Sequence, residues 1–137
     1  MDEKELVELA FSAREKAYAP YSGFCVGAAL LTEGGKVYLG CNIENAAYTP
    51  SNCAERTAFF KAVSEGERAF RAIAIVGGAK GKPEYDFCAP CGVCRQVMME
   101  FCRGDFGILL ANSKKEIRRY TLQELMPMGF GPDMLNE

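Results

Sequence analysis

The sequence predicts an α/β fold in which a sheet lies between helices in a three-layer α-β-α sandwich. Three observations support this class. Segments with the apolar pattern of strands alternate along the chain with segments of helical spacing. The 137 residues are enough for one domain with its own hydrophobic core. A hydrophobic content of 49% beside 25% charged residues is ordinary for a globular protein. We therefore predict a single domain over residues 1–137.

The first predicted elements are a helix and a hairpin. Apolar residues recur at helical spacing over residues 6–17, and Pro20 ends this pattern after Ala19. The nearly continuous apolar run of residues 24–32 predicts a strand that is buried on both faces. A short turn with two glycines leads to a second strand over residues 37–41, so the two strands are expected to form a hairpin.

A polar loop and a second helix follow the hairpin. Residues 42–52 are polar and contain Pro50, which is typical of a loop. Ser51 or Asn52 is expected to cap the next helix, and Gly66 to close it. The buried face of this helix is expected to carry Ala54, Ala58, Phe59, Ala62 and Val63.

The C-terminal half predicts three further strands around another helix. Residues 73–76 are expected to form a short buried strand, and the Gly- and Lys-rich residues 77–86 a loop. The next helix is expected to open at Pro90 or Cys91 and to end near Gly104. Its inward side chains are expected to be Val93, Val97, Met98 and Phe101. The last elements are two strands and one helical turn, over residues 106–111, 117–120 and 122–126.

Charge and composition argue against several classes of function. A net charge of −2 and a pI near 5.3 give no general attraction to a polyanion, which disfavours a nucleic-acid substrate. Because the start of the chain is charged and no long apolar run follows, we expect neither a secretory signal nor a membrane segment. Seven cysteines fit a reducing compartment better than a disulfide framework, so we expect a cytoplasmic protein.

Two cysteine motifs carry the chemistry of this chain, which has no histidine. Cys-Ala-Glu at residues 53–55 is followed by Pro-Cys-Gly-Val-Cys at residues 90–94. Both motifs lie at predicted helix N-termini, which favour thiolate anions, and Cys91 and Cys94 share one helix face. Three cysteines predict a zinc ion whose fourth position is held by water, which is the catalytic pattern. Glu55 is then placed to move protons, so the motifs predict an enzyme that adds water to its substrate.

Arg56 is a candidate to adjust the charge of this site. Three thiolates and one Zn²⁺ sum to −1, which weakens the metal as a Lewis acid. Arg56 can offset this charge by donating hydrogen bonds to the sulfur of Cys53, and the alternative is an ordinary surface arginine. Other cysteines in apolar stretches are expected to be small buried residues, namely Cys25, Cys41 and Cys102.

Cys88 leaves two other functions open. With the three cysteines of the motifs it would complete a four-thiolate structural zinc site, in a binding domain that has no use for Glu55. Its spacing from Cys91 also makes a second Cys-x-x-Cys, which is a redox motif. The redox interpretation is weaker, because that motif normally follows a strand directly and gives Cys53 no role.

Taken in order, the motifs resemble those of the zinc-dependent cytidine deaminases, in particular the small three-cysteine type. The similar segments are residues 19–29, 40–46, 90–96 and 125–132, together with the Cys-Ala-Glu motif. The resemblance covers nearly the whole chain. It implies a mixed five-stranded sheet with both cysteine-bearing helices on one face, and a homotetramer whose pockets borrow residues from neighbouring subunits.

The resemblance also implies roles for individual residues. The expected ligands of one zinc ion per chain are Cys53, Cys91 and Cys94, with Glu55 as the proton shuttle. The expected substrate contacts are Phe24 at the pyrimidine, Asn42 and Glu44 at the ribose, the backbone of Ala54 at the base edge, and Phe130 from a neighbouring subunit. Arg56 and Gln96 are expected to support the metal ligands.

The implied reaction is the hydrolytic deamination of cytidine and deoxycytidine to uridine and deoxyuridine, a step of pyrimidine salvage. Related folds act on other aminated nucleosides, such as blasticidin-type antibiotics, and that alternative stays open. The carboxylate of Glu44 disfavours a 5′-phosphate near it. The chain departs from the family pattern at Ala89, where a hydroxyl residue is common, and in residues 77–87, which form a longer segment than usual.

Overall fold

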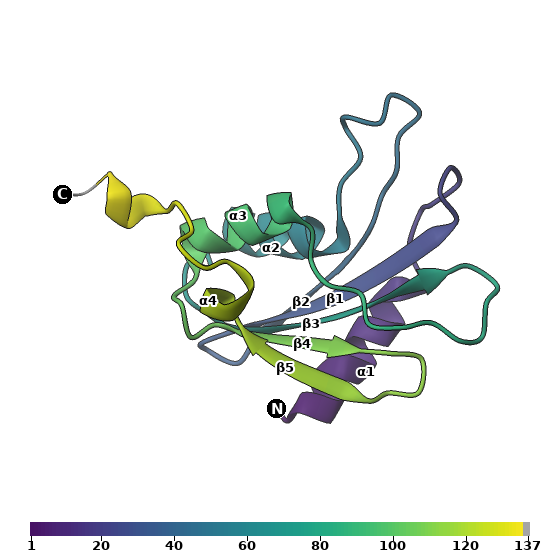
Figure 1. Ribbon diagram of the computed structural model, residues 1–137, viewed down its shortest axis with the longest axis horizontal. Coiled ribbons are helices and arrows are strands. Elements are labelled where there is room, and N and C mark those ends of the chain that lie inside the picture. Colours follow the sequence, from purple (N-terminus) through teal and green to yellow (C-terminus); the bar gives the residue numbers. More distant parts are fainter. Residues whose placement is uncertain (136–137) are drawn as a thin grey trace.

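In the computed structural model, which describes residues 1–135, a five-stranded sheet has helices on both faces (Figure 1). The strands lie in the order β2-β1-β3-β4-β5. They are β1 Phe24–Thr32, β2 Val37–Cys41, β3 Phe70–Ala79, β4 Gly107–Ala111 and β5 Ile117–Thr121. The helices are α1 Glu3–Arg14, α2 Ala54–Ser64, α3 Gly92–Phe101, α4 Leu122–Leu125 and the 3₁₀ turn η1 Pro132–Met134. The predicted three-layer α/β architecture is confirmed.

The sheet is mixed, as the family resemblance implies. β1 pairs antiparallel with both β2 and β3, and β4 pairs antiparallel with β5. β3 and β4 run parallel. Parallel neighbours need a crossover connection, and α3 supplies it between these two strands.

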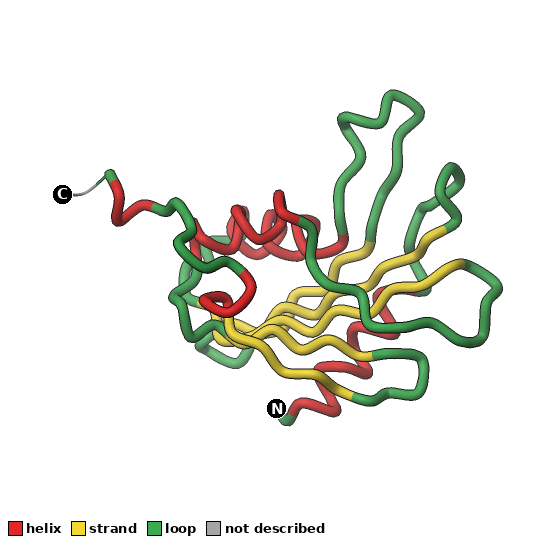
Figure 2. The backbone as a smooth tube through the Cα atoms, in the orientation of Figure 1, coloured by secondary structure: helices red, strands yellow, loops and turns green. Residues whose placement is uncertain are grey.

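The helices divide between the two faces of the sheet (Figure 2). On one face α1 packs Leu6 and Ala10 against residues of the central strands, including Ala29 and Val76. None of the helices in residues 1–135 is long and apolar enough to span a membrane.

The opposite face carries α2 and α3, the two cysteine-bearing helices. Phe59 of α2 and Met98 of α3 are fully buried in one cluster with Ile73, Ile75 and Ile108 of the sheet. Because helices cover both faces, the central strands β1 and β3 are buried on both sides, which explains the continuous apolar run of β1.

Glycines in the first two strands let helices lie directly on the sheet. A Cβ at Gly40 would lie 2.3 Å from the carbonyl oxygen of Ala54, in the first turn of α2. A Cβ at Gly27 would lie 2.1 Å from the carbonyl oxygen of Ala10 in α1. The contact at Gly40 therefore sets how close the N-terminus of α2, with its Cys-Ala-Glu motif, lies to the sheet.

Several predicted boundaries are confirmed, and two predicted helices are too long. β1 and β2 have their predicted bounds, and β4, β5 and α4 differ from the predictions by one residue at one end. α1 ends at Arg14 rather than at Ala19, because Tyr18 leaves the helix and pairs with Ile43. α3 ends at Phe101 rather than near Gly104, because the backbone of Cys102 is extended.

The prediction of a loop from residue 77 onward is wrong at its start. β3 spans residues 70–79 rather than 73–76, and Gly77 and Gly78 are within the ladder that pairs with β1. The aromatic ring of Tyr85 occupies the space above Gly78, where a Cβ would lie 2.2 Å from the ring. These glycines therefore serve close packing and not a turn.

The helix caps also differ from the prediction. Cys53 and Cys91 are themselves the N-cap residues of α2 and α3, without side-chain capping bonds, so neither Ser51 nor Asn52 caps α2. The Asn52 backbone instead exchanges hydrogen bonds with that of Ile43. The predicted closure of α2 at Gly66 agrees with the positive φ of that residue.

We predict that Gly40→Ala will displace the N-terminus of α2. The added methyl group collides with backbone atoms and not with a flexible side chain. We expect the free energy of unfolding to fall by about 1–3 kcal/mol, with reduced zinc content per chain. Denaturant unfolding and metal analysis measure both quantities. Gly34→Ala is the matched control, since a Cβ there meets only the Thr32 hydroxyl at 3.8 Å, and equal effects of the two changes would contradict the assignment.

Candidate functional site

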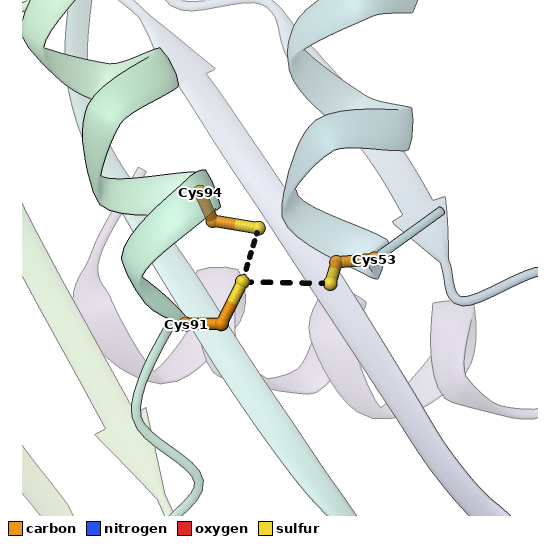
Figure 3. Close-up of side chains that lie close together, drawn as sticks. All are labelled: Cys53, Cys91 and Cys94. Atoms are coloured by element: carbon orange, nitrogen blue, oxygen red, sulfur yellow. Dashed lines mark hydrogen bonds between the residues drawn. The ribbon is translucent and has the colours of Figure 1, made fainter. Parts of the chain in front are cut away.

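Three cysteine sulfurs converge where the N-termini of α2 and α3 meet (Figure 3). The Sγ atoms of Cys53 and Cys91 are 3.7 Å apart, and those of Cys91 and Cys94 are 3.5 Å apart. All three lie within 4.8 Å of one another, and all are free thiols. Each sits at a helix N-terminus, where the unpaired backbone N–H groups favour an anion.

These distances fit a zinc ion. Zinc–sulfur bonds of about 2.3 Å in tetrahedral geometry place neighbouring sulfurs about 3.8 Å apart. The two sulfur–sulfur separations come close to this value. Thiolates are also preferred zinc donors. The three cysteines are thus arranged to hold one zinc ion.

The structure does not support the four-thiolate alternative. In the described part of the chain, the cluster suited to a metal contains three cysteines, and Cys88 is outside it. The Cys88 thiol packs instead against β3, where a Cβ at Gly77 would lie 2.9 Å from its sulfur. A three-cysteine site leaves a coordination position free of protein ligands, which is the arrangement of catalytic zinc.

Arg56 takes the predicted place beside the cluster. Its Nη2 donates a hydrogen bond of 3.2 Å to the sulfur of Cys53. The pKa of Cys53 is lowered because its sulfur accepts hydrogen bonds from Cys94, Arg56 and Cys91. The Nε of Arg56 is buried and has no hydrogen-bond partner among residues 1–135. Arg56 is therefore a partly buried cation that contacts a cysteine sulfur, and the structure does not support the surface alternative for this residue.

Glu55 is buried at the edge of the same cluster. Only 4% of its surface is exposed, although it carries a carboxyl group. Burial raises the pKa of Glu55 to about 7, and the negative charge of Cys53 acts in the same direction. Burying an ionised carboxylate without an ion pair costs free energy, so burial favours the protonated form. Glu55 thus has the environment of a group that exchanges a proton near neutral pH.

A cavity of about 560 Å³ opens over the cysteines and Glu55. Seven of the residues predicted for metal, proton transfer or substrate line it, namely Phe24, Asn42, Glu44, Cys53, Ala54, Glu55 and Cys91. Arg56 also reaches its wall. The volume falls within the usual range for small-molecule sites.

Asn42 and Glu44 are both oriented by the backbone of residues 21–26. Asn42 accepts a hydrogen bond from the N–H of Val26 at 2.9 Å and donates one to the carbonyl of Phe24 at 2.8 Å. Glu44 accepts bonds from the N–H groups of Tyr21 and Ser22, both at 3.0 Å. The pKa of Glu44 is lowered by its hydrogen bonds to Ser22, so the carboxylate stays ionised.

Three predicted residues do not line this cavity: Cys94, which is buried behind it in the cysteine cluster, and Gln96 and Phe130, which lie outside the cluster. Phe130 follows α4 in the C-terminal segment, with 55% of its surface exposed. Gln96 donates a hydrogen bond to the carbonyl of Phe130 at 2.8 Å, so its amide holds this segment against α3. The role of Phe130 in a neighbouring subunit's pocket stays a prediction.

Sequence reasoning missed several residues of the cavity wall. Ser22, Val26 and Tyr48 line it without having been singled out. Val93 was predicted to face the core, but it is 56% exposed and borders the cavity. Its place in the first turn of α3, between the two cysteines of one motif, was a signal that it would lie beside the metal cluster.

Comparison with known proteins agrees with this geometry. Residues 1–109 match the family model described as the cytidine and deoxycytidylate deaminase zinc-binding region. A cytidine deaminase of Sporosarcina psychrophila is 51% identical over 136 residues, which cover 99% of this chain and 96% of that protein. One of Halalkalibacterium halodurans is 50% identical over the full length of both chains.

Solved structures give the same result for the fold. The crystal structure of a cytidine deaminase from Burkholderia pseudomallei superimposes with a TM-score of 0.87 at 48% identity, covering 95% of this chain and all of that one. A cytidine deaminase from Mycobacterium tuberculosis has a TM-score of 0.78 at 35% identity, over 96% of this chain and 98% of that one.

We predict that Arg56→Ala will weaken zinc binding. The change removes the hydrogen bond to Cys53 and leaves the thiolate charge without its cation. Loss of such a supporting contact lowers metal affinity by about 10- to 100-fold. Competition with a chromophoric chelator measures the affinity. Arg71→Ala is the control, because Arg71 lies on the surface in an exposed ion pair, and an Arg56→Ala protein with control-like affinity would contradict the role of Arg56.

Proposed function

This chain belongs to the family of cytidine and deoxycytidylate deaminases, and we propose that it hydrolyses cytidine and deoxycytidine to uridine, deoxyuridine and ammonia. The observation that carries the proposal is the convergence of three cysteine sulfurs and the buried Glu55 on one cavity. This arrangement supplies a metal site, a proton carrier and space for a nucleoside in one place. The reaction is a step of pyrimidine salvage.

Cys53, Cys91 and Cys94 would hold one zinc ion per chain. When bound, zinc lowers the pKa of water to about 7 and so supplies a nucleophile at neutral pH. Arg56 keeps the Cys53 thiolate partly neutralised, which limits the electron density that the sulfurs give to the ion.

Glu55 would carry the protons of the reaction. Its carboxylate accepts a proton from the attacking water and donates it to N3 of the cytosine ring. It then takes the second proton, from the new C4 hydroxyl group, and carries it to the amino group, so that the C4–N bond breaks, a C4 carbonyl forms and ammonia leaves. One residue can serve both steps because it lies in the first turn of α2, two positions from a metal ligand, and faces the cavity.

The remaining wall residues would bind and orient the nucleoside. Phe24, 42% exposed at the cavity, offers an aromatic face to the pyrimidine. Asn42 and Glu44 offer an amide and an ionised carboxylate to the sugar hydroxyls. The buried Ala54 reaches the wall beside the cysteines, where its backbone would meet the base edge. The Glu44 carboxylate repels a nearby 5′-phosphate, which favours a nucleoside over a nucleotide.

A homotetramer is part of the proposal. Exposed aromatic side chains border the open side of the cavity, notably Tyr21 and Tyr48, with Tyr48 74% exposed. Phe130 is exposed too, and lines no cavity of its own chain among those described. Burial of these surfaces between subunits, with Phe130 entering a neighbour's pocket, accounts for both observations. The seven free cysteines support a cytoplasmic location.

The substrate prediction is tested by ammonia release from cytidine, deoxycytidine, cytosine and cytidine monophosphate. We expect turnover of the two nucleosides with about one zinc per chain, and much slower turnover of the free base, which lacks a sugar for Asn42 and Glu44 to bind. Zinc content is determined on the same preparation. Zinc-loaded protein that deaminates none of the four compounds would contradict the proposed reaction.

We predict that Glu55→Gln will retain its fold and zinc while kcat falls by about 10²–10⁴. The amide preserves the size of the side chain but cannot accept and return a proton. Steady-state kinetics and metal analysis separate the two effects. Glu84→Gln, in the exposed loop after β3, is the control. A Glu55→Gln enzyme with near wild-type kcat would remove the proton-shuttle role.

A further inference from the structure

The hydroxyl group of Ser22 lies between two residues that face the substrate. It donates a hydrogen bond to Oε2 of Glu44 and accepts one of 3.0 Å from the backbone N–H of Phe24. The backbone N–H of Ser22 also donates to Oε1 of Glu44 at 3.0 Å. Ser22 thus contacts both oxygens of the carboxylate and joins it to the start of β1.

From these contacts we propose that Ser22 is a positioning residue that orients the Glu44 carboxylate toward a sugar hydroxyl of the nucleoside. The inference rests on the proposed function, because it assigns the geometry of the sugar subsite within it. Ser22 acts through Glu44 and takes no direct part in the chemistry on the base.

Without these contacts the Glu44 side chain would be free to rotate. Its side chain is partly exposed in a polar loop, with three rotatable bonds and no ion pair among those found in residues 1–135. A carboxylate has about four lone-pair directions. The N–H groups of Tyr21 and Ser22 and the Ser22 hydroxyl occupy three of them. The carboxylate is held against rotation, and one acceptor direction remains for a hydroxyl donor.

The turn that carries Ser22 is itself anchored. Gly23 has a φ of +69°, its N–H donates to the carbonyl of Ala19, and its own carbonyl accepts from the N–H of Lys80 at 2.6 Å. The turn is therefore tied to the residue that follows β3. A hydroxyl on a fixed turn can hold a flexible carboxylate in one orientation, which is the requirement for a binding group that is ordered before the substrate arrives.

The position of this contact agrees with a sugar subsite. Ser22 and Glu44 line the cavity that contains the cysteines, and they also line the adjoining hollow beside Tyr48. They lie at the boundary between the deep part of the site and its outer opening. A nucleoside whose base reaches Glu55 would place its sugar at this boundary.

The same contacts allow a simpler role, in which Ser22 only stabilises its turn. A serine hydroxyl that accepts from the N–H two residues later is a common turn motif. A turn stabiliser would affect all substrates alike. A residue that orients Glu44 toward a hydroxyl would affect only substrates that carry the hydroxyl, so the two roles predict different kinetics.

The test compares cytidine with 2′,3′-dideoxycytidine, which lacks both ring hydroxyls of the sugar. In zinc-loaded Ser22→Ala protein we expect the ratio of kcat/KM for the two substrates to fall by about tenfold, through KM for cytidine with kcat nearly unchanged. Ser22→Thr keeps the hydroxyl and is expected to restore most of the ratio. In a Glu44→Gln background, Ser22→Ala should cause no further fall in the ratio.

Equal losses for both substrates, or an unchanged ratio, would overturn the positioning role and leave the deaminase assignment intact. Wild-type protein that releases no ammonia from cytidine would overturn the deaminase assignment and the positioning role with it. Melting temperature and zinc content are measured on every variant. If Ser22→Ala is unstable, Ser22→Cys keeps the side-chain shape with a weak donor and provides the same comparison.

Discussion

The meeting of two helix N-termini over one face of the sheet is the constraint on which the site depends. α2 brings Cys53, and α3 brings Cys91 and Cys94, each at a point where unpaired backbone N–H groups favour negative charge. Neither cysteine cap forms a side-chain capping bond, so the sulfurs remain available to a metal. The approach of α2 to the sheet at Gly40 and the crossover of α3 between β3 and β4 bring these N-termini together.

Arg56 offsets part of the negative charge that the cysteines and Glu55 bring to the site. Three thiols and a buried carboxyl group would accumulate negative charge in a small volume, and Arg56 is the cation that contacts a sulfur there. On the opposite wall, Asn42 and Glu44 already have backbone partners. The polar groups proposed to bind the sugar are therefore held in place by the backbone of residues 21–26 before a ligand arrives, which reduces the conformational entropy lost on binding.

Much of the fold follows from local pattern, and the exceptions have tertiary causes. The apolar run of β1, the hairpin turn and the cysteine spacing are local signals, and each prediction from them is confirmed. Gly77 and Gly78 led to the prediction of a loop because glycine usually marks turns. In the structure they lie in β3, where the missing side chains leave room for Cys88 and Tyr85 from a later segment. The contact between Ser22 and Glu44 also joins residues from different segments, so no periodicity could reveal it.

The separation of the metal ligands along the chain has a consequence for folding. Cys91 and Cys94 are neighbours on one helical turn, whereas Cys53 is separated from them along the chain by α2 and by β3, which lies between β1 and β4 in the sheet. To bring Cys53 to the other two cysteines, an unfolded chain has to close a long loop, which costs conformational entropy. In the folded chain the three cysteines already lie together, so metal binding carries no such cost. A metal ion therefore prefers the folded chain, and its binding free energy adds to the stability of the sheet. A zinc ion held by the three cysteines would therefore stabilise the tertiary structure as well as take part in the chemistry.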